Sequence, residues 1–524
     1  MTSARELVRR SLIVLTGCLL AVAALGPIDG ARGAAQKELP LGPLGLEERR
    51  VTNRLAPGVK HTMIERGHRS PNDFFTVDVV LVQARNRAEA VARRLRRLGH
   101  DARVEVIGKA APDDPRRGPI GYLVRVGRFP TEEPAERAAE VLLAEGFEEA
   151  APTYTGFDGG PTTGPWVVNV LDIELHRFTG ELVPELGTHV VPGLETLTDI
   201  AARTDPLAAV NGGYFVIEPI DGTPGDLAGI SVLDGHLISE AVNGRTSLLL
   251  RENDGTHASI AALRTSLRAR VSGGGQWLVD GLNRKPGLIR SCGGVGGDVP
   301  TQRPKHDITC SDSGEVVQFT AAFGARTEEG PGIEAVLDRD GRVIALREER
   351  GGLIPPGGSV LAATGEETLR LQRRVQIGDH VVVRERLSAN GSGVRLAGLD
   401  VVNGGPRLLS GGHTRITAFR EGFVHLDDPF FYVAFGLRRN PRTIAGITDD
   451  GHLLLVTIDG RQPDWSVGAS FIEEARVMRS LGAAESVNLD GGGSTTLTIG
   501  DELANRPSDE EGERPIGDAL LLLP

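Results

Sequence analysis

The chain has 524 residues, of which 40% are hydrophobic and 24% charged, and its 69 glycines indicate many turns and a β-rich body. A length well above roughly 250–300 residues predicts at least two globular domains. The formal net charge of −12 argues against a nucleic-acid-binding protein, because phosphate backbones are bound by clustered cations.

The N-terminus has the pattern of an export signal. Several arginines precede the apolar run 12–25, and small residues follow it. We predict a signal peptide over residues 1–35, with cleavage near Ala35. Two alternatives stay open: lipid anchoring at Cys18, whose neighbours resemble a lipoprotein cleavage box, and an uncleaved membrane anchor. All three place the body outside the cytoplasm, secreted or associated with the cell wall.

Export makes the cysteine count informative. Without the signal peptide only Cys292 and Cys310 remain, and such a pair in an oxidising compartment is expected to form a disulfide. A metal site with the nearby His306 and Asp307 is the rival reading, which the lack of a CxxC spacing disfavours. We therefore predict a disulfide here. Asp490, Asp459 and backbone oxygens would suit Ca²⁺ or Mg²⁺, and this alternative stays open, but no EF-hand spacing or histidine cluster supports it, so no metal and no other cofactor are included in the prediction.

Residues 36–70 are polar with scattered proline and glycine, which suggests a linker. The next segment, 71–155, twice repeats a strand, a helix and a strand. The apolar spacing predicts strands over 74–82, 102–107, 122–128 and 148–154, and helices over 87–98 and 132–144. Two such halves within about 80 residues suggest a ferredoxin-like βαββαβ domain.

The strand that opens the second half is the most characteristic part of this segment. Tyr122–Phe129 reads YLVRVGRF, that is Tyr-x-Val-x-Val-Gly-x-Phe, and a helix follows. With this pattern the segment resembles the SPOR family of peptidoglycan-binding domains. The first strand departs from the family, because Ala84-Arg85-Asn86 stands where Gly-x-Phe is usual. The resemblance implies binding to cell-wall glycan; the alternative is a small α+β domain without a ligand.

The segment 160–524 reads as strands separated by tight turns. Asp-Gly pairs between apolar runs predict hairpins at 234–235, 340–341 and 450–451. One helix is expected after Ser470, because Ser470 and Glu473 form a capping-box pattern and apolar residues then recur at helical spacing. That helix leads into a strand over 485–489.

Glycine-rich polar clusters follow several of the predicted strands. The most informative is SVNLDGGGSTTL, residues 486–497, in which three consecutive glycines leave bare backbone beside a carboxylate and an amide. A similar cluster, NGGYF at 211–215, lies far upstream. Such backbone suits an anionic or sugar ligand held against main-chain N–H groups. The alternative is an ordinary glycine-rich turn.

Further clusters extend this pattern toward the C-terminus. They are VVNGGPRLL (401–409), NPRTIAGIT (440–448), LLLVTIDGRQP (453–463) and the tail NRPSDEEGERPIGDALLLL (505–523). In this order the set resembles the NAGPA-type phosphodiester glycosidase family. The resemblance implies a larger β-rich α+β domain that hydrolyses sugar-1-phosphodiesters of the N-acetylglucosamine-1-phosphodiester type. Such a reaction requires an acid or base and groups that neutralise the phosphate.

Two carboxylates are the candidate catalytic residues. Asp490 is the first, because its turn places it at a strand end against open backbone. Asp459, at the end of the strand 453–458, is the second, with a hairpin turn as the alternative. The predicted substrate-binding residues are Asn211, Gly212, Gly213, Arg442, Thr443, Arg461, Asn488, Gly491, Gly492, Gly493 and Ser494. Their arginines are expected to bind phosphate oxygens and their asparagines sugar hydroxyls or water.

The sequence as a whole predicts an exported hydrolase of a cell-wall or capsular glycan, tethered by its SPOR-like domain. The expected partners are peptidoglycan or another wall glycan and a carbohydrate phosphodiester substrate; no nucleic acid is expected and no protein partner is inferred. Two alternatives stay open: a non-catalytic glycan-binding protein, and a phosphodiesterase that acts on a teichoic-acid-like polymer.

Overall fold

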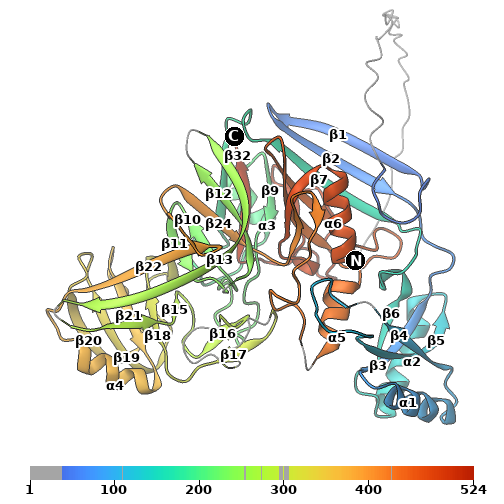
Figure 1. The fold of residues 1–524 in the computed structure, drawn as a ribbon, viewed down its shortest axis with the longest axis horizontal. Coiled ribbons are helices and arrows are strands. Elements are labelled where there is room, and N and C mark those ends of the chain that lie inside the picture. The colour runs from blue at the N-terminus through green and yellow to red at the C-terminus, as the bar shows by residue number, and fades with distance from the viewer. Residues whose placement is uncertain are drawn as a thin grey trace, which may run out of the picture. The chain divides into compact units, whose positions relative to one another are not determined.

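The computed structural model describes residues 38–524 except 109, 243, 253–254, 273, 294–298, 300–305 and 426–427. The predicted signal peptide and Cys18 lie outside these residues. Within the described chain no helix combines the length and the apolar character needed to cross a membrane. Strands predominate over helices, which confirms the β-rich α+β class (Figure 1).

The helices are short and each buries one apolar side. They are α1 (Arg85–Arg97), α2 (Glu132–Ala144), α3 (Leu197–Thr204), α4 (Gly365–Arg374), α5 (Pro429–Tyr432) and α6 (Phe471–Ser480). The predicted capping box starts α6: the Ser470 hydroxyl accepts from the Glu473 N–H, and the Glu473 carboxylate accepts from the Ser470 N–H. This pairing satisfies two N–H groups that the first helical turn would otherwise leave unbonded.

The segment 71–155 folds as an antiparallel sheet with two helices on one face. Its strands are β3 (Phe75–Val82), β4 (Ala102–Ile107), β5 (Gly121–Phe129) and β6 (Ala151–Tyr154), in the sheet order β4-β5-β3-β6. Val77 and Val124 pack against Ala88 of α1 and Leu142 of α2. The chain order β3-α1-β4-β5-α2-β6 has the predicted elements at the predicted places, although the last strand starts later than expected.

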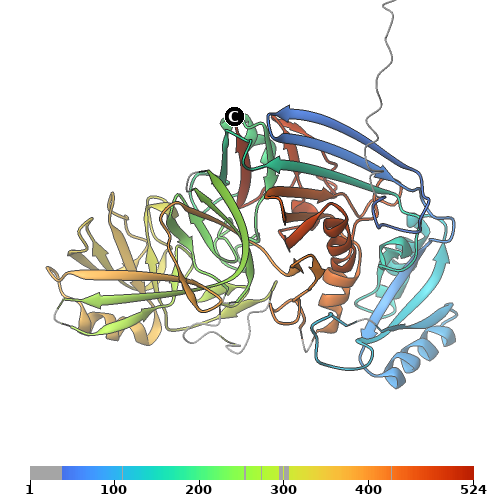
Figure 2. The same cartoon turned by 45° about the horizontal axis from the view of Figure 1, so that its top comes forward.

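Residues 48–66 form a β-hairpin in the segment for which the sequence suggested a linker. β1 (Glu48–Ala56) pairs with β2 (Val59–Arg66), and β2 pairs along its length with β7 (Trp166–Glu174). Figures 1 and 2 show the three strands side by side. The linker prediction is wrong here because the partner of β2 lies a whole domain further along the chain, where local patterns carry no information about it.

β7 belongs to an eight-stranded sheet with the order β1-β2-β7-β28-β27-β29-β25-β26. Its other strands are β25 (Arg407–Ser410), β26 (His413–Thr414), β27 (Arg442–Thr448), β28 (His452–Ile458) and β29 (Ala483–Asn488). α6 packs on one face of this sheet through residues such as Phe471 and Met478, which contact Ile444 and its neighbours. β29 is paired on both sides, so the turn that follows it starts from a rigid strand.

A five-stranded sheet packs on the other face of the eight-stranded sheet. It contains β8 (Glu181–Leu186), β9 (Ala208–Asn211), β30 (Leu497–Ile499), β31 (Glu502–Leu503) and β32 (Asp518–Leu523), in the order β31-β30-β9-β32-β8. Val210 and Leu520 of this sheet share a buried core with Leu455 and Val487 of the other. The packing brings the ends of β9 and β29 to the same place.

The remaining strands form an eight-stranded sheet, a five-stranded sheet and a small hairpin, β16–β17. One sheet has the order β11-β10-β24-β12-β13-β22-β23, with β14 also paired to β13, and another has the order β15-β18-β21-β19-β20. The bounds are β10 (Ser231–Leu233), β11 (His236–Ser239), β12 (Thr246–Glu252), β13 (Thr256–Val271), β14 (Gln276–Val279), β15 (Gly281–Leu282), β16 (Leu288–Arg290), β17 (Thr309–Ser311), β18 (Val316–Phe319), β19 (Gly330–Leu337), β20 (Val343–Arg350), β21 (Ser359–Ala363), β22 (Val381–Ala389), β23 (Ser392–Val394) and β24 (Leu399–Asn403). The three predicted Asp-Gly hairpins are present, joining β10 to β11, β19 to β20 and β27 to β28.

Candidate active site

The two glycine-rich clusters that the sequence singled out meet in space. β29 leads into Asp490 and the short turn Gly492–Ser494, and β9 ends at Asn211. The Asn211 Nδ2 donates to the Asp490 carbonyl oxygen (2.9 Å), and the Asp490 N–H donates to the Gly212 carbonyl oxygen (3.2 Å). The Gly492 N–H donates to the Pro441 carbonyl oxygen (2.9 Å), just before β27. Three segments remote in sequence therefore build one turn.

The predicted asparagines and Thr443 hold the backbone around this turn. Asn211 is buried, and its Oδ1 accepts from the Thr443 hydroxyl (2.6 Å) and the Thr496 N–H (3.1 Å). Asn488 is also buried, and its Nδ2 donates to the Tyr214 hydroxyl (2.6 Å). The structure therefore places these side chains as supports of the site and away from the surface that a substrate would touch.

Asp490 is the partly exposed carboxylate of the turn. Its Oδ1 accepts from the Gly491 N–H (2.9 Å). Burial raises the pKa of Asp490 to about 6; the Ser494 hydroxyl, the Gly491 N–H and Arg514 act in the lowering direction, and the charge of Asp307 raises it further. A carboxyl group of this pKa exchanges its proton near neutral pH, as a general acid or base must.

The glycines of the turn allow two arginines to lie directly over it. A Cβ atom on Gly492 would come within 3.2 Å of the Arg461 Nη2, and a Cβ on Gly493 would overlap the Arg514 Nη2 at 2.2 Å. Gly492 also has a φ of +62°, which a side chain would strain. The glycines thus bring two guanidinium groups against the turn that carries Asp490.

Arg461 is the predicted phosphate-binding arginine that reaches the surface. It is exposed, and its Nε and Nη2 donate to the Asn440 Oδ1 at 3.2 and 3.0 Å. Its φ of +59° lies in the left-handed region, a backbone conformation that non-glycine residues adopt at a cost and often at functional sites. Desolvation and the neighbouring charges of Arg442 and Arg514 lower the pKa of Arg461, and this concentration of positive charge suits an anionic ligand.

Arg442, the other predicted arginine, lies in the interior of the protein and supports the site from there. It is fully buried, its Nε donates to the Ala469 carbonyl oxygen (2.9 Å) and pairs with Glu474 (2.9 Å). Its guanidinium also lies over the Phe471 ring at 4.6 Å. Because these partners occupy its guanidinium, Arg442 contributes positive charge to the site but is not placed to bind a phosphate.

Asp459, the second predicted catalytic residue, is fully buried and holds the C-terminal tail. Its carboxylate accepts from the Trp465 Nε1 (2.7 Å), the Asn505 Nδ2 (3.1 Å) and the Arg506 N–H (3.1 Å). Three donors from the protein leave the carboxylate little capacity for a substrate, so its geometry is that of a structural anchor. Catalysis by Asp459 therefore stays a prediction that this geometry does not favour. Two of its three partners, Asn505 and Arg506, come from the C-terminal tail, which local sequence does not connect to this strand.

Gly212 and Gly213 are required by close packing. A Cβ on Gly212 would lie 2.4 Å from the Asp518 Oδ1, and one on Gly213 would lie 2.4 Å from the Asn403 Nδ2. The Gly213 N–H donates to the Asp518 Oδ1 (2.9 Å), and burial raises the pKa of Asp518 to about 7. Asp518 is a buried carboxylate beside Asp490 that the motifs did not single out.

The predicted disulfide loop carries a further carboxylate, Asp307, which pairs with Arg290 and whose charge acts on the site. Cys292 and Cys310 are bonded, with their Cα atoms 5.2 Å apart, and the short pair β16–β17 flanks the loop they close. Asp307 lies in this loop, is largely exposed and interacts electrostatically with Asp490. The only signal in the sequence was the disulfide itself, which showed that this loop is held in place.

Arg514 was also missed, although its segment belongs to the recognised tail. It is paired with Asp509 at 2.7 Å, and both side chains lie over Gly493. Across the described residues no group of three or more His, Cys, Asp or Glu side chains is placed to hold a metal ion. What the arrangement offers is a carboxyl group that titrates near neutral pH beside two guanidinium groups. That combination suits acid–base chemistry on an anionic substrate.

Two family models match the chain. The model of the phosphodiester glycosidase (NAGPA) family matches residues 331–523, and that of the SPOR domain matches residues 71–153. No curated protein matches the chain.

Among solved structures, a putative exported protein from Burkholderia pseudomallei K96243 is 34% identical. The alignment covers 93% of this chain and 98% of that chain, with a TM-score of 0.86. A hypothetical protein from Synechocystis shares the fold at 17% identity and a TM-score of 0.53, over 91% and 79% of the two chains. The catalytic domain of zebrafish N-acetylglucosamine-1-phosphodiester alpha-N-acetylglucosaminidase is 14% identical over 71% and 78%; its TM-score of 0.32 is too low to establish a common fold.

Proposed function

This chain belongs to the phosphodiester glycosidase (NAGPA) family and contains a SPOR domain, and we propose on that basis that it hydrolyses sugar-1-phosphodiester linkages in a cell-wall or capsular glycan. The SPOR domain holds the enzyme at peptidoglycan, outside the cytoplasm. The similar protein from Burkholderia pseudomallei, described as exported, supports that location. The sugar is of the N-acetylglucosamine type that the family name implies.

The observation that carries the proposal is the position of Asp490 beside Arg461 and Arg514. In the reaction the two guanidinium groups bind the phosphate oxygens by charge-assisted hydrogen bonds. A water molecule attacks the anomeric carbon, and Asp490 takes the proton of that water as a general base. The bond between the anomeric carbon and the phosphate oxygen breaks, and its electrons leave with the phosphate, where the arginines stabilise the charge.

Asp307 is the second carboxylate in this proposal and takes the place expected of Asp459. Glycoside hydrolysis commonly uses two carboxyl groups that flank the bond to be cleaved. Burial is the main cause that raises the pKa of Asp490, and the negative charge of Asp307 adds to it, which keeps Asp490 basic enough to accept a proton from water.

The test is release of free N-acetylglucosamine from a methylphospho- or UDP-linked α-N-acetylglucosaminide. Wild type is compared with Asp490→Asn, with Arg461→Met, and with Asp450→Asn in the exposed turn between β27 and β28 as the matched control. We expect no turnover from Asp490→Asn, a raised KM from Arg461→Met and full activity from the control. Equal turnover by wild type and Asp490→Asn would refute the assignment.

The product also separates the competing classes of function. A phosphomonoester released with the sugar still attached would indicate attack at phosphorus, as in a teichoic-acid phosphodiesterase. Wild-type protein that binds peptidoglycan but acts on no member of a panel of phosphodiester-linked sugars would be a non-catalytic glycan-binding protein.

A further inference from the structure

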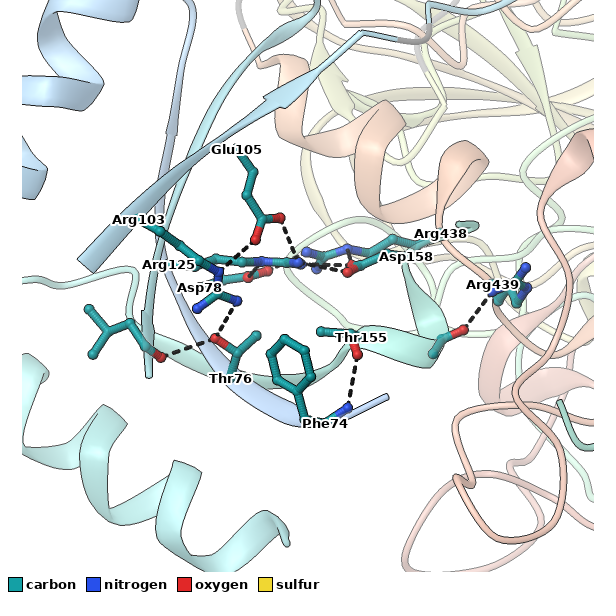
Figure 3. Close-up of polar contacts among 12 residues, drawn as sticks. Phe74, Thr76, Asp78, Arg103, Glu105, Arg125, Thr155, Asp158, Arg438 and Arg439 are labelled. Atoms are coloured by element: carbon teal, nitrogen blue, oxygen red, sulfur yellow. Dashed lines mark hydrogen bonds and ion pairs between the residues drawn. The ribbon is translucent and has the colours of Figure 1, made fainter. Parts of the chain in front are cut away.

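The SPOR-domain sheet has a charged face opposite α1 and α2. Side chains alternate along a strand, so Val77 points into the core beneath the helices and Asp78 points the other way. We call this the polar face of the SPOR sheet; it carries Thr76, Asp78, Arg103, Glu105 and Arg125, which Figure 3 shows together.

Arg125 is the centre of this face and is almost fully buried. Its Nε donates to the Asp78 Oδ1 (2.7 Å) and its Nη1 to the Glu105 Oε2 (2.9 Å). Asp158, just after β6, receives two further bonds from the guanidinium, both of 2.7 Å (Figure 3). Such a bidentate pair fixes the plane of the guanidinium as well as its charge.

The charges of this cluster do not balance within the SPOR domain and the segment that follows it. Three carboxylates (Asp78, Glu105 and Asp158) surround two arginines, since Arg103 also pairs with Glu105 at 2.7 Å. One negative charge therefore remains on a cluster whose centre, Arg125 and Asp78, is buried, and leaving a charge uncompensated there is costly. A cation from another part of the chain would balance it.

Arg438 of the glycosidase domain supplies that cation. Its Nη2 donates to the Asp78 Oδ2, and its Nε lies 3.5 Å from the Asp158 Oδ1 (Figure 3). The adjacent Arg439 donates to the carbonyl oxygens of Gly156 and Gly160, both at 2.7 Å. Two consecutive arginines thus dock the start of the glycosidase segment 438–441 against the SPOR domain and the residues that follow it.

The same short segment holds the candidate active site. The Asn440 Oδ1 accepts both hydrogen bonds from the guanidinium of Arg461, and the Pro441 carbonyl oxygen accepts from the Gly492 N–H. Three Cα–Cα steps separate residue 438 from residue 441, at most about 11 Å of chain. We call residues 438–441 the strap. This one short segment therefore makes the contact with the SPOR domain as well as the contacts that position Arg461 and the glycine turn.

We propose that the SPOR domain is part of the scaffold of the active site. Docking of Arg438 on its polar face fixes the strap 438–441, and the strap fixes Arg461 and the turn that carries Asp490. Arg438 and Asp78 are positioning residues that act through Asn440 and Pro441. This role goes beyond tethering to the wall, because a tether affects only substrates attached to the wall, whereas a scaffold affects every substrate, including small soluble ones.

The first measurement is kcat/KM of the full chain on a small soluble phosphodiester-linked sugar, and this arm rests on the proposed function. A displacement of a binding group by about 1 Å costs up to about 100-fold in rate. We therefore expect kcat/KM to fall between about 10- and 100-fold in Arg438→Met and in Asp78→Asn. The double variant is expected to lose less than the two single losses combined, because both substitutions break the contact between Arg438 and Asp78.

Two control variants separate positioning from general damage. Arg438→Lys keeps a positive charge against Asp78 and is expected to retain most of the activity. Arg97→Met removes an exposed arginine from α1 on the other side of the same domain and is expected to behave as wild type. A loss in Arg438→Met that equals the loss in Arg97→Met would overturn the proposal.

The second measurement does not require turnover. Hydrogen exchange of the peptide that spans residues 486–497 reports the Gly492 N–H, whose acceptor is on the strap. We expect exchange there to be about tenfold faster in Arg438→Met, with strand β28 unchanged. Unchanged exchange at 486–497, or an equal increase over the whole chain, would overturn the scaffold role. A specific increase in a protein that turns over no substrate would instead support the scaffold and refute the glycosidase assignment.

Discussion

Replacing Asp490 by asparagine is expected to stabilise the protein at neutral pH while it removes activity. The amide keeps an oxygen that can accept the Gly491 N–H at the position of Oδ1. It removes a negative charge that the turn holds in a partly buried position next to Asp307. Active sites commonly pay for function in this way, so a stabilising effect is itself informative about the role of the carboxylate.

The size of the effect follows from the pKa of Asp490. A rise from the ordinary 3.8 to about 6 corresponds to about 3 kcal/mol. Because the folded state binds this proton more tightly than the unfolded chain does, the wild-type protein is most stable with respect to this group below pH 3.8. That contribution is lost as the pH rises from about 4 to about 6. An asparagine cannot ionise, so Asp490→Asn does not undergo this loss of stability; the variant should exceed wild type by up to about 3 kcal/mol at pH 8 and by little at pH 4.

Urea unfolding followed by tryptophan fluorescence between pH 4 and pH 8 measures this difference. Asp501→Asn, in the exposed turn between β30 and β31, is the matched control and should follow wild type throughout. The reasoning is refuted if Asp490→Asn is less stable than wild type at pH 8, or if the difference between the two proteins does not change with pH.

Three further substitutions test other parts of the structure. Replacing Cys292 and Cys310 by serine removes a cross-link over 18 residues and should lower the free energy of unfolding by about 3 kcal/mol. It should also lower kcat/KM through Asp307; unchanged activity would exclude Asp307 from the reaction. Asp459→Asn turns an NH2 group toward one of the three buried donors and should lower the free energy of unfolding by about 2 kcal/mol. We expect kcat of the folded protein to stay unchanged; a loss of kcat at unchanged stability would make Asp459 catalytic. Arg245 is buried, and among the described residues none of its guanidinium nitrogens has a hydrogen-bond partner, although the group lies over the Phe423 ring at 4.9 Å and interacts with the charge of Glu421. Methionine keeps the contact with the ring and removes an unbonded buried charge, so Arg245→Met should leave the melting temperature unchanged or raise it. A fall of several degrees would contradict that reasoning.

The elements that sequence patterns predicted well are those whose cause is local. The capping box at Ser470 and Glu473 sets the start of α6 within one turn of chain. At the first Asp-Gly hairpin both Asp234 and Gly235 adopt positive φ, which suits the twist of the two strands they join, and at the other two hairpins the glycine alone does so. The SPOR-like segment was predictable for the same reason, since each helix lies between strands that are near it in sequence.

The candidate site was only partly predictable because its residues owe their roles to partners that are remote in sequence. Asp490 and Arg461 could be selected from their glycine-rich surroundings. Asp459 looked equivalent in sequence, and it differs in having three donors to its carboxylate, two of which come from the distant C-terminal tail. No local pattern marks Arg514, and Asp307 was considered only as a metal ligand, since the two lie in a tail and a disulfide loop that are remote from the turn in sequence.

The pairing of β2 with β7 makes the SPOR domain an insertion in the middle of another domain. Arg66 at the end of β2 is the register partner of Trp166 at the start of β7, so the two ends of the inserted segment lie about 5 Å apart. Ends this close can be joined by a short turn, which would leave a continuous hairpin of β2 and β7. A glycosidase domain cut at residue 160 would instead lose β1 and β2 and expose the edge of β7. The unpaired backbone groups of that edge could then pair with another copy of the chain and cause aggregation. The excision that respects this sheet therefore removes residues 67–165 and keeps the N-terminal hairpin.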